Sequence, residues 1–116
     1  MTRALFLLIL TSVTMSAVAQ LLLKQGVAAV GGGSPLRYAT SPMILAGFAI
    51  YGLGAILWLF VLARLPLSAA YPFVGLGFIA TMLLGIIALG ENVSSTRIAG
   101  TLLIAAGCVL VARSLP

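Results

Sequence analysis

The first apolar stretch of this chain reads ALFLLILTSVTMSAVAQLLLKQGVAAV, from Ala4 to Val30. It is long enough to cross a membrane as one helix, since a span needs about 20 apolar residues. Polar side chains recur at every fourth position within it, and four residues advance an α-helix by about 400°. They therefore form a slowly winding polar stripe on one face of the helix, made of Ser12, Ser16, Gln20 and Lys24.

This polar stripe is expected to face a cavity or another helix, because a cation is costly in contact with lipid. We predict a wet, positively biased chamber whose other walls are the remaining membrane spans. Two orientations of Lys24 are open: its amine can point inward as an anion site, or it can reach out to the membrane interface. Thr11 and Thr14 are expected to bond to carbonyls of their own helix, which the longer Gln20 amide cannot do.

Composition places the chain in a membrane. It has 116 residues, of which 63% are hydrophobic and 6% charged, and its mean hydropathy is +1.31. A soluble domain of this length cannot bury so much apolar surface. The net charge of +5 comes from six scattered cations, a pattern typical of membrane topology signals and not of nucleic-acid binding.

Few residues in this chain are suited to chemistry. Glu91 is the sole acid, Cys108 the sole cysteine, and histidine is absent. These counts argue against a metal site, a cysteine cluster and a catalytic constellation, so we expect no enzyme, no catalytic residue, no cofactor and no metal.

The N-terminus also has features of a secretory signal peptide. Arg3 precedes an apolar run that ends in Ala17-Val18-Ala19, a cleavage-site pattern. The run continues through Leu21-Leu22-Leu23, however, and three further apolar segments follow. We therefore expect the first segment to be a permanent span.

The sequence predicts an all-α membrane protein with one four-helix transmembrane domain over residues 1–116. Gly31-Gly32-Gly33 followed by Ser34-Pro35 ends the first helix, and a loop is expected up to Ser41. Ser41 and Pro42 suit the cap and first position of the second helix. A turn at Pro66 makes the second and third spans antiparallel neighbours. The expected helices cover residues 4–30, 42–64, 66–89 and 95–113.

Small residues mark two further features. Pro72, Gly75 and Gly77 form a predicted hinge in the third span, because proline removes a backbone donor and glycine bends cheaply. Gly100 and Gly107 either give the fourth span a small-residue face for packing between subunits, or are glycines of the kind that membrane helices simply tolerate.

The cations divide almost evenly between the two membrane sides, so the positive-inside rule sets little orientation. We expect the chain to insert both ways or to need a partner, and an antiparallel dimer would join two polar stripes around one cavity. One side would carry Arg3, Arg64 and Arg113, and the other Arg37 and Arg97 with Lys24.

Three more residues are candidates for substrate binding. Trp58 and Tyr71 either belong to an interfacial aromatic belt or line the cavity. Glu91 lies before the fourth span, where it either favours the helix N-terminus and pairs with Arg97 or forms a gate or contacts a cationic substrate group. The spans themselves contain no acid, which disfavours proton-coupled export of cations. A cation with hydroxyls and an amide suits a phosphate-bearing ligand.

Several short motifs carry a family resemblance over nearly the whole chain. They are AQLLLKQ at 19–25, WLFVL at 58–62, LPLSAAYP at 65–72, GENVS at 90–94, and the Gly100-x-x-Leu103-Ile104-x-x-Gly107 pattern. With them the chain resembles the small multidrug resistance and EamA-like transporters of the drug/metabolite transporter superfamily, most of all the Arn-type undecaprenyl-phosphate-aminoarabinose flippase subunits.

The resemblance implies a multi-pass protein of the bacterial inner membrane that forms a homodimer or pairs with a similar small subunit. Ser16 occupies the position of the essential glutamate of the drug exporters, and the Arn-type proteins likewise lack that glutamate. A polyprenyl-phosphate-linked sugar is therefore the implied substrate. Alternating access would exchange two forms bent differently at Gly75-Leu76-Gly77.

On this hypothesis, Lys24 neutralises the phosphate together with Arg64, and Ser16, Gln20 and Tyr71 hold the sugar. One alternative is an exporter of small cationic compounds with Glu91 as its coupling acid. Another is a non-transporting membrane subunit that stabilises a partner.

Overall fold

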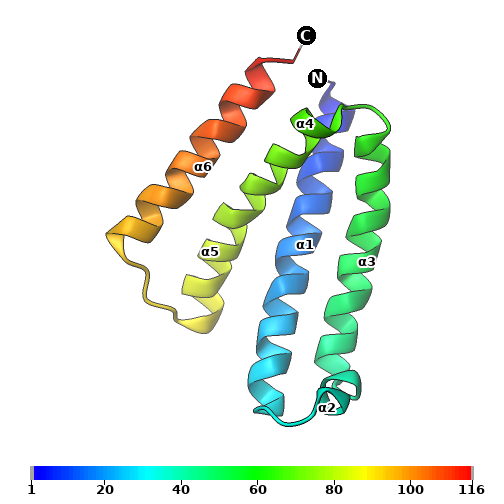
Figure 1. Ribbon diagram of the computed structural model, residues 1–116, viewed down its shortest axis with the longest axis vertical. Helices are drawn as coiled ribbons and strands as arrows, with labels where there is room; N and C mark the ends of the chain where they lie inside the picture. Colours follow the sequence, from blue (N-terminus) through cyan, green and yellow to red (C-terminus); the bar gives the residue numbers. More distant parts are fainter. Residues whose placement is uncertain (1, 116) are drawn as a thin grey trace.

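The computed structural model of this protein describes residues 2–115, within which all regular structure is helical. Four helical stretches are long and apolar enough to cross a membrane: Arg3–Val30, Pro42–Leu62, Leu67–Leu89 and Ser95–Arg113. They alternate in direction, so the first begins and the last ends at the same end of the bundle (Figure 1). The predicted all-α membrane fold is confirmed, and the chain is a multi-pass membrane protein.

The first span is a single helix, α1 (Arg3–Val30), that ends where the glycines predict. Gly31, Gly32 and Gly33 have φ angles of 74°, 93° and 113°, a region that a residue with a Cβ avoids. A short helix, α2 (Pro35–Ala39), follows where a loop was expected. Its reason is local, because a proline at the first position already has a helical φ and needs no N–H partner.

The second span, α3 (Pro42–Leu62), begins as predicted, with the Ser41 hydroxyl accepting a hydrogen bond from the Ile44 N–H. It packs closely on α1 because glycines face the contact. A Cβ on Gly47 would lie 3.2 Å from the Ala19 carbonyl oxygen. α1 and α3 thus form the tightest helix pair of the bundle.

The third span changes helix type where Pro72 was expected to weaken it. It consists of α4 (Leu67–Ala70), the 3₁₀ segment η1 (Tyr71–Val74) and α5 (Gly75–Leu89). Both predicted hinge glycines also face neighbouring helices. A Cβ on Gly75 would lie 2.6 Å from the Cys108 sulfur, and one on Gly77 would lie 3.3 Å from Val13. Bending at this point stays a prediction.

The last span, α6 (Ser95–Arg113), leans on α5 and η1 and is the least buried of the four. The apolar core instead joins α1, α3 and the start of the third span, near the N-terminal end of α1. It consists of Leu5, Ile9, Val13, Val61, Ala70 and Phe73. This core closes one end of the bundle and leaves the rest of the α1–α5 contact free for a cavity.

Candidate functional site

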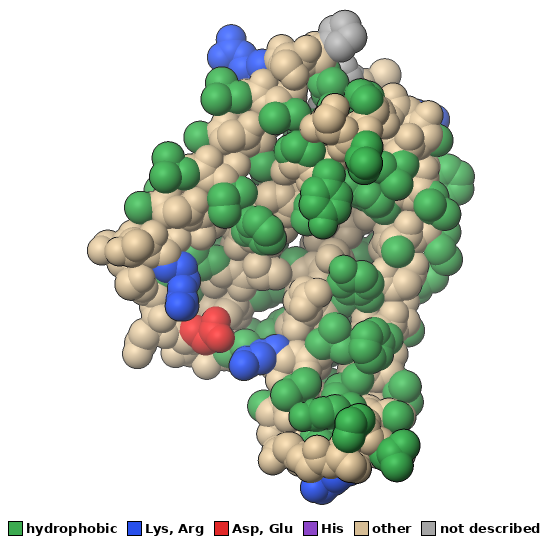
Figure 2. All heavy atoms as spheres, in the orientation of Figure 1, with side chains coloured by type: hydrophobic (Ala, Val, Ile, Leu, Met, Phe, Trp, Pro, Cys, Tyr) green, Lys and Arg blue, Asp and Glu red, His purple; other side chains and the backbone are tan. Residues whose placement is uncertain are grey.

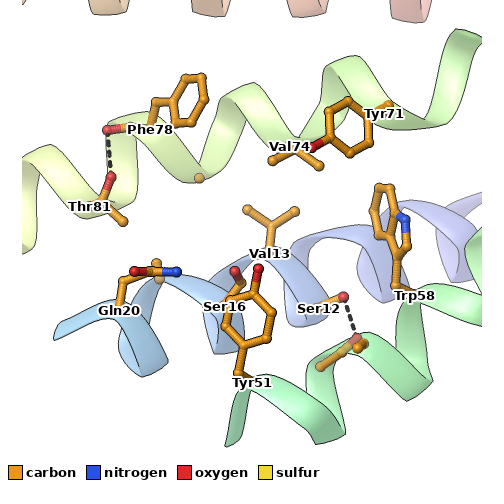
Figure 3. A pocket seen from close by; sticks show the side chains of 14 residues that line it. Ser12, Val13, Ser16, Gln20, Tyr51, Trp58, Tyr71, Val74, Phe78 and Thr81 are labelled. Atoms are coloured by element: carbon orange, nitrogen blue, oxygen red, sulfur yellow. Dashed lines mark hydrogen bonds between the residues drawn. The ribbon is translucent and has the colours of Figure 1, made fainter. Parts of the chain in front are cut away.

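A cavity of about 520 Å³, here called the upper chamber, lies between α1, α3 and the third span (Figure 3). From α1 it receives three residues of the polar stripe, and from α3 and the third span it receives four aromatic side chains. Its lining consists of Ser12, Val13, Ser16, Ala17, Gln20, Tyr51, Gly54, Ala55, Trp58, Tyr71, Val74, Gly77, Phe78 and Thr81.

A second cavity of about 200 Å³, the lower chamber, continues from the first along α1 and α5. The two chambers share Ala17, Gln20 and Thr81. The lower one is completed by Leu21, Lys24, Leu84, Gly85, Leu89 and Glu91. All four residues of the polar stripe therefore line two adjoining cavities, and Gln20 lines both.

The hydroxyls of α1 differ in what they bond. Ser12 is buried and donates a 2.8 Å hydrogen bond to the Gly54 carbonyl on α3, so its hydroxyl joins two helices. Thr11 donates to the Leu7 carbonyl of its own turn, as predicted. Thr14 is exposed, and the bond predicted for it is not found among residues 2–115. Ser16 and Gln20 remain as the cavity's polar groups on this face.

Aromatic side chains form a further part of the upper chamber's wall. Trp58 and Tyr71 both line it, and Tyr71 is 64% exposed, which places it at the cavity's opening. Tyr51 and Phe78 were not singled out from the sequence. Each lies seven residues from a predicted ring, a spacing that returns to the same helix face. Rings and hydroxyls together suit a ligand with both apolar and polar edges.

Two residues of α5 were also missed. Thr81 is the only hydroxyl-bearing residue of α5, and it lines both chambers. It lies three residues after Phe78, to whose carbonyl its hydroxyl donates at 3.1 Å, so helical spacing from the aromatic face was the available signal. Gly85 lies one further turn along the same face.

Some predicted residues do not meet at this cavity. Arg64 follows α3 at the end of the bundle away from Lys24, and it lines neither chamber. The expectation that every other span walls the stripe is wrong for the fourth span. Within residues 2–115, α6 contributes no lining residue to either chamber, because it packs on the outer side of α5 through Gly75 and Cys108.

The lower chamber holds one cation and one anion. Lys24 and Glu91 both line it, and both side chains are exposed. In Figure 2 the acidic side chain, drawn in red, is seen between two basic ones. The lining of the lower chamber thus pairs the predicted cation with an anion, and the positive bias of the chamber stays a prediction.

The sequence is similar to those of several curated proteins. A probable 4-amino-4-deoxy-L-arabinose-phosphoundecaprenol flippase subunit ArnE of Pseudomonas aeruginosa is 39% identical over 88 residues, which cover 76% of this chain and 74% of that protein. A Proteus mirabilis protein of the same description is 32% identical over 109 residues, covering 93% of this chain and 96% of its own. No family model matches the chain, and no solved structure matches it.

Proposed function

Because this chain belongs to the family of ArnE flippase subunits, we propose that it moves an aminoarabinose-type sugar, linked through phosphate to undecaprenol, between the leaflets of the bacterial inner membrane. The observation that carries the proposal is the pair of adjoining cavities between α1, α3 and the third span. It combines aromatic rings, hydroxyls and an amide in the upper chamber with charged groups in the lower one.

Each part of the cavity suits one part of such a lipid. Lys24 offers an ammonium for the phosphate, and charge-assisted hydrogen bonds are the strong ones. Ser16, Gln20 and Thr81 offer groups for sugar hydroxyls, beside the rings of Trp58 and Tyr71. The polyprenyl tail would stay in the bilayer, where its burial costs nothing.

Movement between leaflets requires the cavity to open to each side in turn. The α1–α3 pair is held by glycine contacts along its length, whereas the third span changes helix type at η1. We assign the moving part to the third span, with Pro72, Gly75 and Gly77 as its hinge. The α1–α3 pair would stay rigid, and its helix α1 would hold the polar stripe in place while the third span moves.

The proposed functional unit contains a second, similar four-helix subunit. Relatives are described as subunits of a flippase, and α6 has an outer face that no part of the chain within residues 2–115 covers. A Cβ on Gly100 or Gly107 would meet nothing within 4 Å. These glycines therefore suit close contact with another helix in lipid.

The test is transport in proteoliposomes. A short-chain polyprenyl phosphate aminoarabinose is placed in the inner leaflet, and its amine is followed with a membrane-impermeant amine reagent. Vesicles carrying the chain with its partner subunit are expected to expose the amine faster than empty vesicles. A lipid that stays in its original leaflet in the presence of both subunits contradicts the proposal.

Two variants connect this transport to the cavity. Gln20→Leu should slow exposure about fivefold, because losing one hydrogen bond to the ligand costs about 1 kcal/mol. Thr11→Ala is the matched control on the same helix, since its hydroxyl bonds within α1 and lines neither chamber. Equal transport rates for Gln20→Leu and the wild type would show that the lipid headgroup does not pass through this cavity.

A further inference from the structure

The lower chamber has a feature that phosphate binding alone does not require, namely a carboxylate beside the cation. Glu91 comes from the turn after α5, and Lys24 comes from α1, so residues 67 positions apart in sequence line the same small space. A site that recognised only phosphate would be weakened by this carboxylate, because like charges repel at short range.

The backbone turns sharply to bring Glu91 there. Gly90 has a φ of 66°, which favours glycine. The N–H groups of Gly90 and Glu91 both donate to the Gly85 carbonyl. This turn folds the Glu91 side chain back against Gly85, where a Cβ would collide with the carboxylate. The glycine at position 85 thus leaves room for the Glu91 carboxylate.

The structural role predicted for Glu91 is already filled by another residue. The Ser94 hydroxyl accepts a 3.1 Å hydrogen bond from the Arg97 N–H and caps α6, whose first turn holds no acid. In the part of the chain that the structure describes, the side-chain hydrogen bonds do not involve the Glu91 carboxylate. Its acceptor oxygens are available to a ligand.

We propose that Lys24 and Glu91 form a two-charge subsite that selects lipids carrying both a phosphate and a protonated amine. Lys24 binds the phosphate and Glu91 accepts hydrogen bonds from the sugar ammonium, with Gly85 as the residue that positions Glu91. This inference rests on the proposed function and adds the group that distinguishes an amino sugar from other sugars on the same carrier.

Charge balance explains the selectivity. The subsite has one positive and one negative group, and a ligand with a phosphodiester and an ammonium offers each its counterpart. A ligand without the amine brings only negative charge and leaves Glu91 unpaired beside it. Specificity therefore comes from repulsion of the wrong lipid as well as attraction of the right one.

The experiment compares binding of two short-chain polyprenyl phosphate arabinoses, one with a free 4-amine and one with that amine formylated. The purified protein, with its partner subunit, is titrated in lipid nanodiscs, and fluorescence of Trp58 reports binding from the upper chamber. The wild type should prefer the free amine by about tenfold or more, as expected for a hydrogen bond to a charged group.

Variants separate the two charges. Glu91→Gln should abolish the preference and leave affinity for the formylated lipid unchanged or higher, whereas Lys24→Gln should weaken both lipids. Gly85→Ala should lose the preference as Glu91→Gln does, because it displaces the carboxylate. Asn92→Ala in the same turn and Gly52→Ala, whose Cβ meets nothing within 4 Å, are matched controls that should keep it.

The outcomes distinguish the two proposals. If Glu91→Gln keeps the wild-type preference while its melting temperature shows a folded protein, the subsite is overturned. If both lipids bind the wild type equally and Lys24→Gln weakens both, the flippase proposal stands and the role of Glu91 fails. If neither lipid binds the wild type, both proposals are contradicted.

Discussion

At the scale of single residues, the polar side chains of α1 divide by the partners that they bond. The Ser12 hydroxyl donates a hydrogen bond to the Gly54 carbonyl of α3. Ser16 lies one turn further and lines the upper chamber. Neighbouring serines on one helix face therefore have different physical roles, one in helix packing and one at the cavity surface.

This difference predicts that alanine variants of the two serines have different effects, one on stability and the other on lipid binding. Ser12→Ala should lower the free energy of unfolding by about 1 kcal/mol, because a buried interhelical hydrogen bond is lost. Ser16→Ala should leave stability unchanged and weaken lipid binding instead. Thermal unfolding in detergent and titration with the lipid measure the two effects, and equal loss of stability in both variants would contradict the assignment.

At the scale of helices, glycine position decides which elements approach closely. Gly47 faces α1, whereas Gly52 lies on the same helix and faces open space. In lipid, helices associate through close packing of small residues, since no hydrophobic effect drives them together. The α1–α3 contact should therefore be sensitive to a side chain at position 47 and insensitive to one at position 52.

We expect Gly47→Leu to destabilise the protein by about 1–3 kcal/mol, the usual cost of forcing atoms into a packed contact. The variant would push against the Ala19 carbonyl and the Leu23 side chain. Gly52→Leu is the matched control and should unfold at the wild-type temperature. Similar melting temperatures for the two variants would show that α1 and α3 are less tightly packed.

The contact between α5 and α6 gives a second test at this scale. Gly75→Ala should lower the melting temperature, because the added methyl group meets the Cys108 sulfur and Ile104. Adding Cys108→Ala should recover part of the loss, since residues in contact are not additive. If Gly75 serves only as a hinge, Gly75→Ala should slow transport without this rescue.

At the scale of the whole molecule, α1 and α3 form one closely packed pair, the third span packs beside it, and α6 lies on the outside. α6 lines neither chamber in the described chain and is the least buried span. A second subunit seated on α6 would cover this helix without blocking the cavity, which lies on the other side of α5.

Gly107→Trp should weaken association of the subunits about tenfold or more, because a bulky ring prevents close helix approach. Energy transfer between labelled subunits in nanodiscs measures the change. Leu53→Trp on α3, a residue that is 56% exposed, is the control for adding a ring to a lipid-facing position. Unchanged association of the Gly107→Trp protein would move the interface to another face.

Much of the fold could be predicted from local patterns. The four spans follow from apolar length, the end of α1 from three glycines, and the start of α3 from Ser41 and Pro42. That the polar residues of α1 share one helix face follows from their four-residue spacing. Such features depend on residues close together in sequence, where helix geometry relates position to direction.

Other features depended on residues far apart in sequence. Gly47 and Gly52 look alike in the sequence, and only the position of α1 separates a packing glycine from an open one. Arg64 and Glu91 were both candidates for the site. The directions of the helices place Glu91 in the same chamber as Lys24, and they place Arg64 at the other end of the bundle.

The sequence by itself determined that this protein has four membrane helices with an inward polar stripe, because lipid penalises polar groups and helix periodicity places them on one face. Only the tertiary structure decided that α6 lies outside the cavities and that Glu91 and Lys24 line the same chamber. Both features depend on which helices pack together. Glycines at the helix contacts determine that packing, and the left-handed backbone of Gly90 directs Glu91 toward α5.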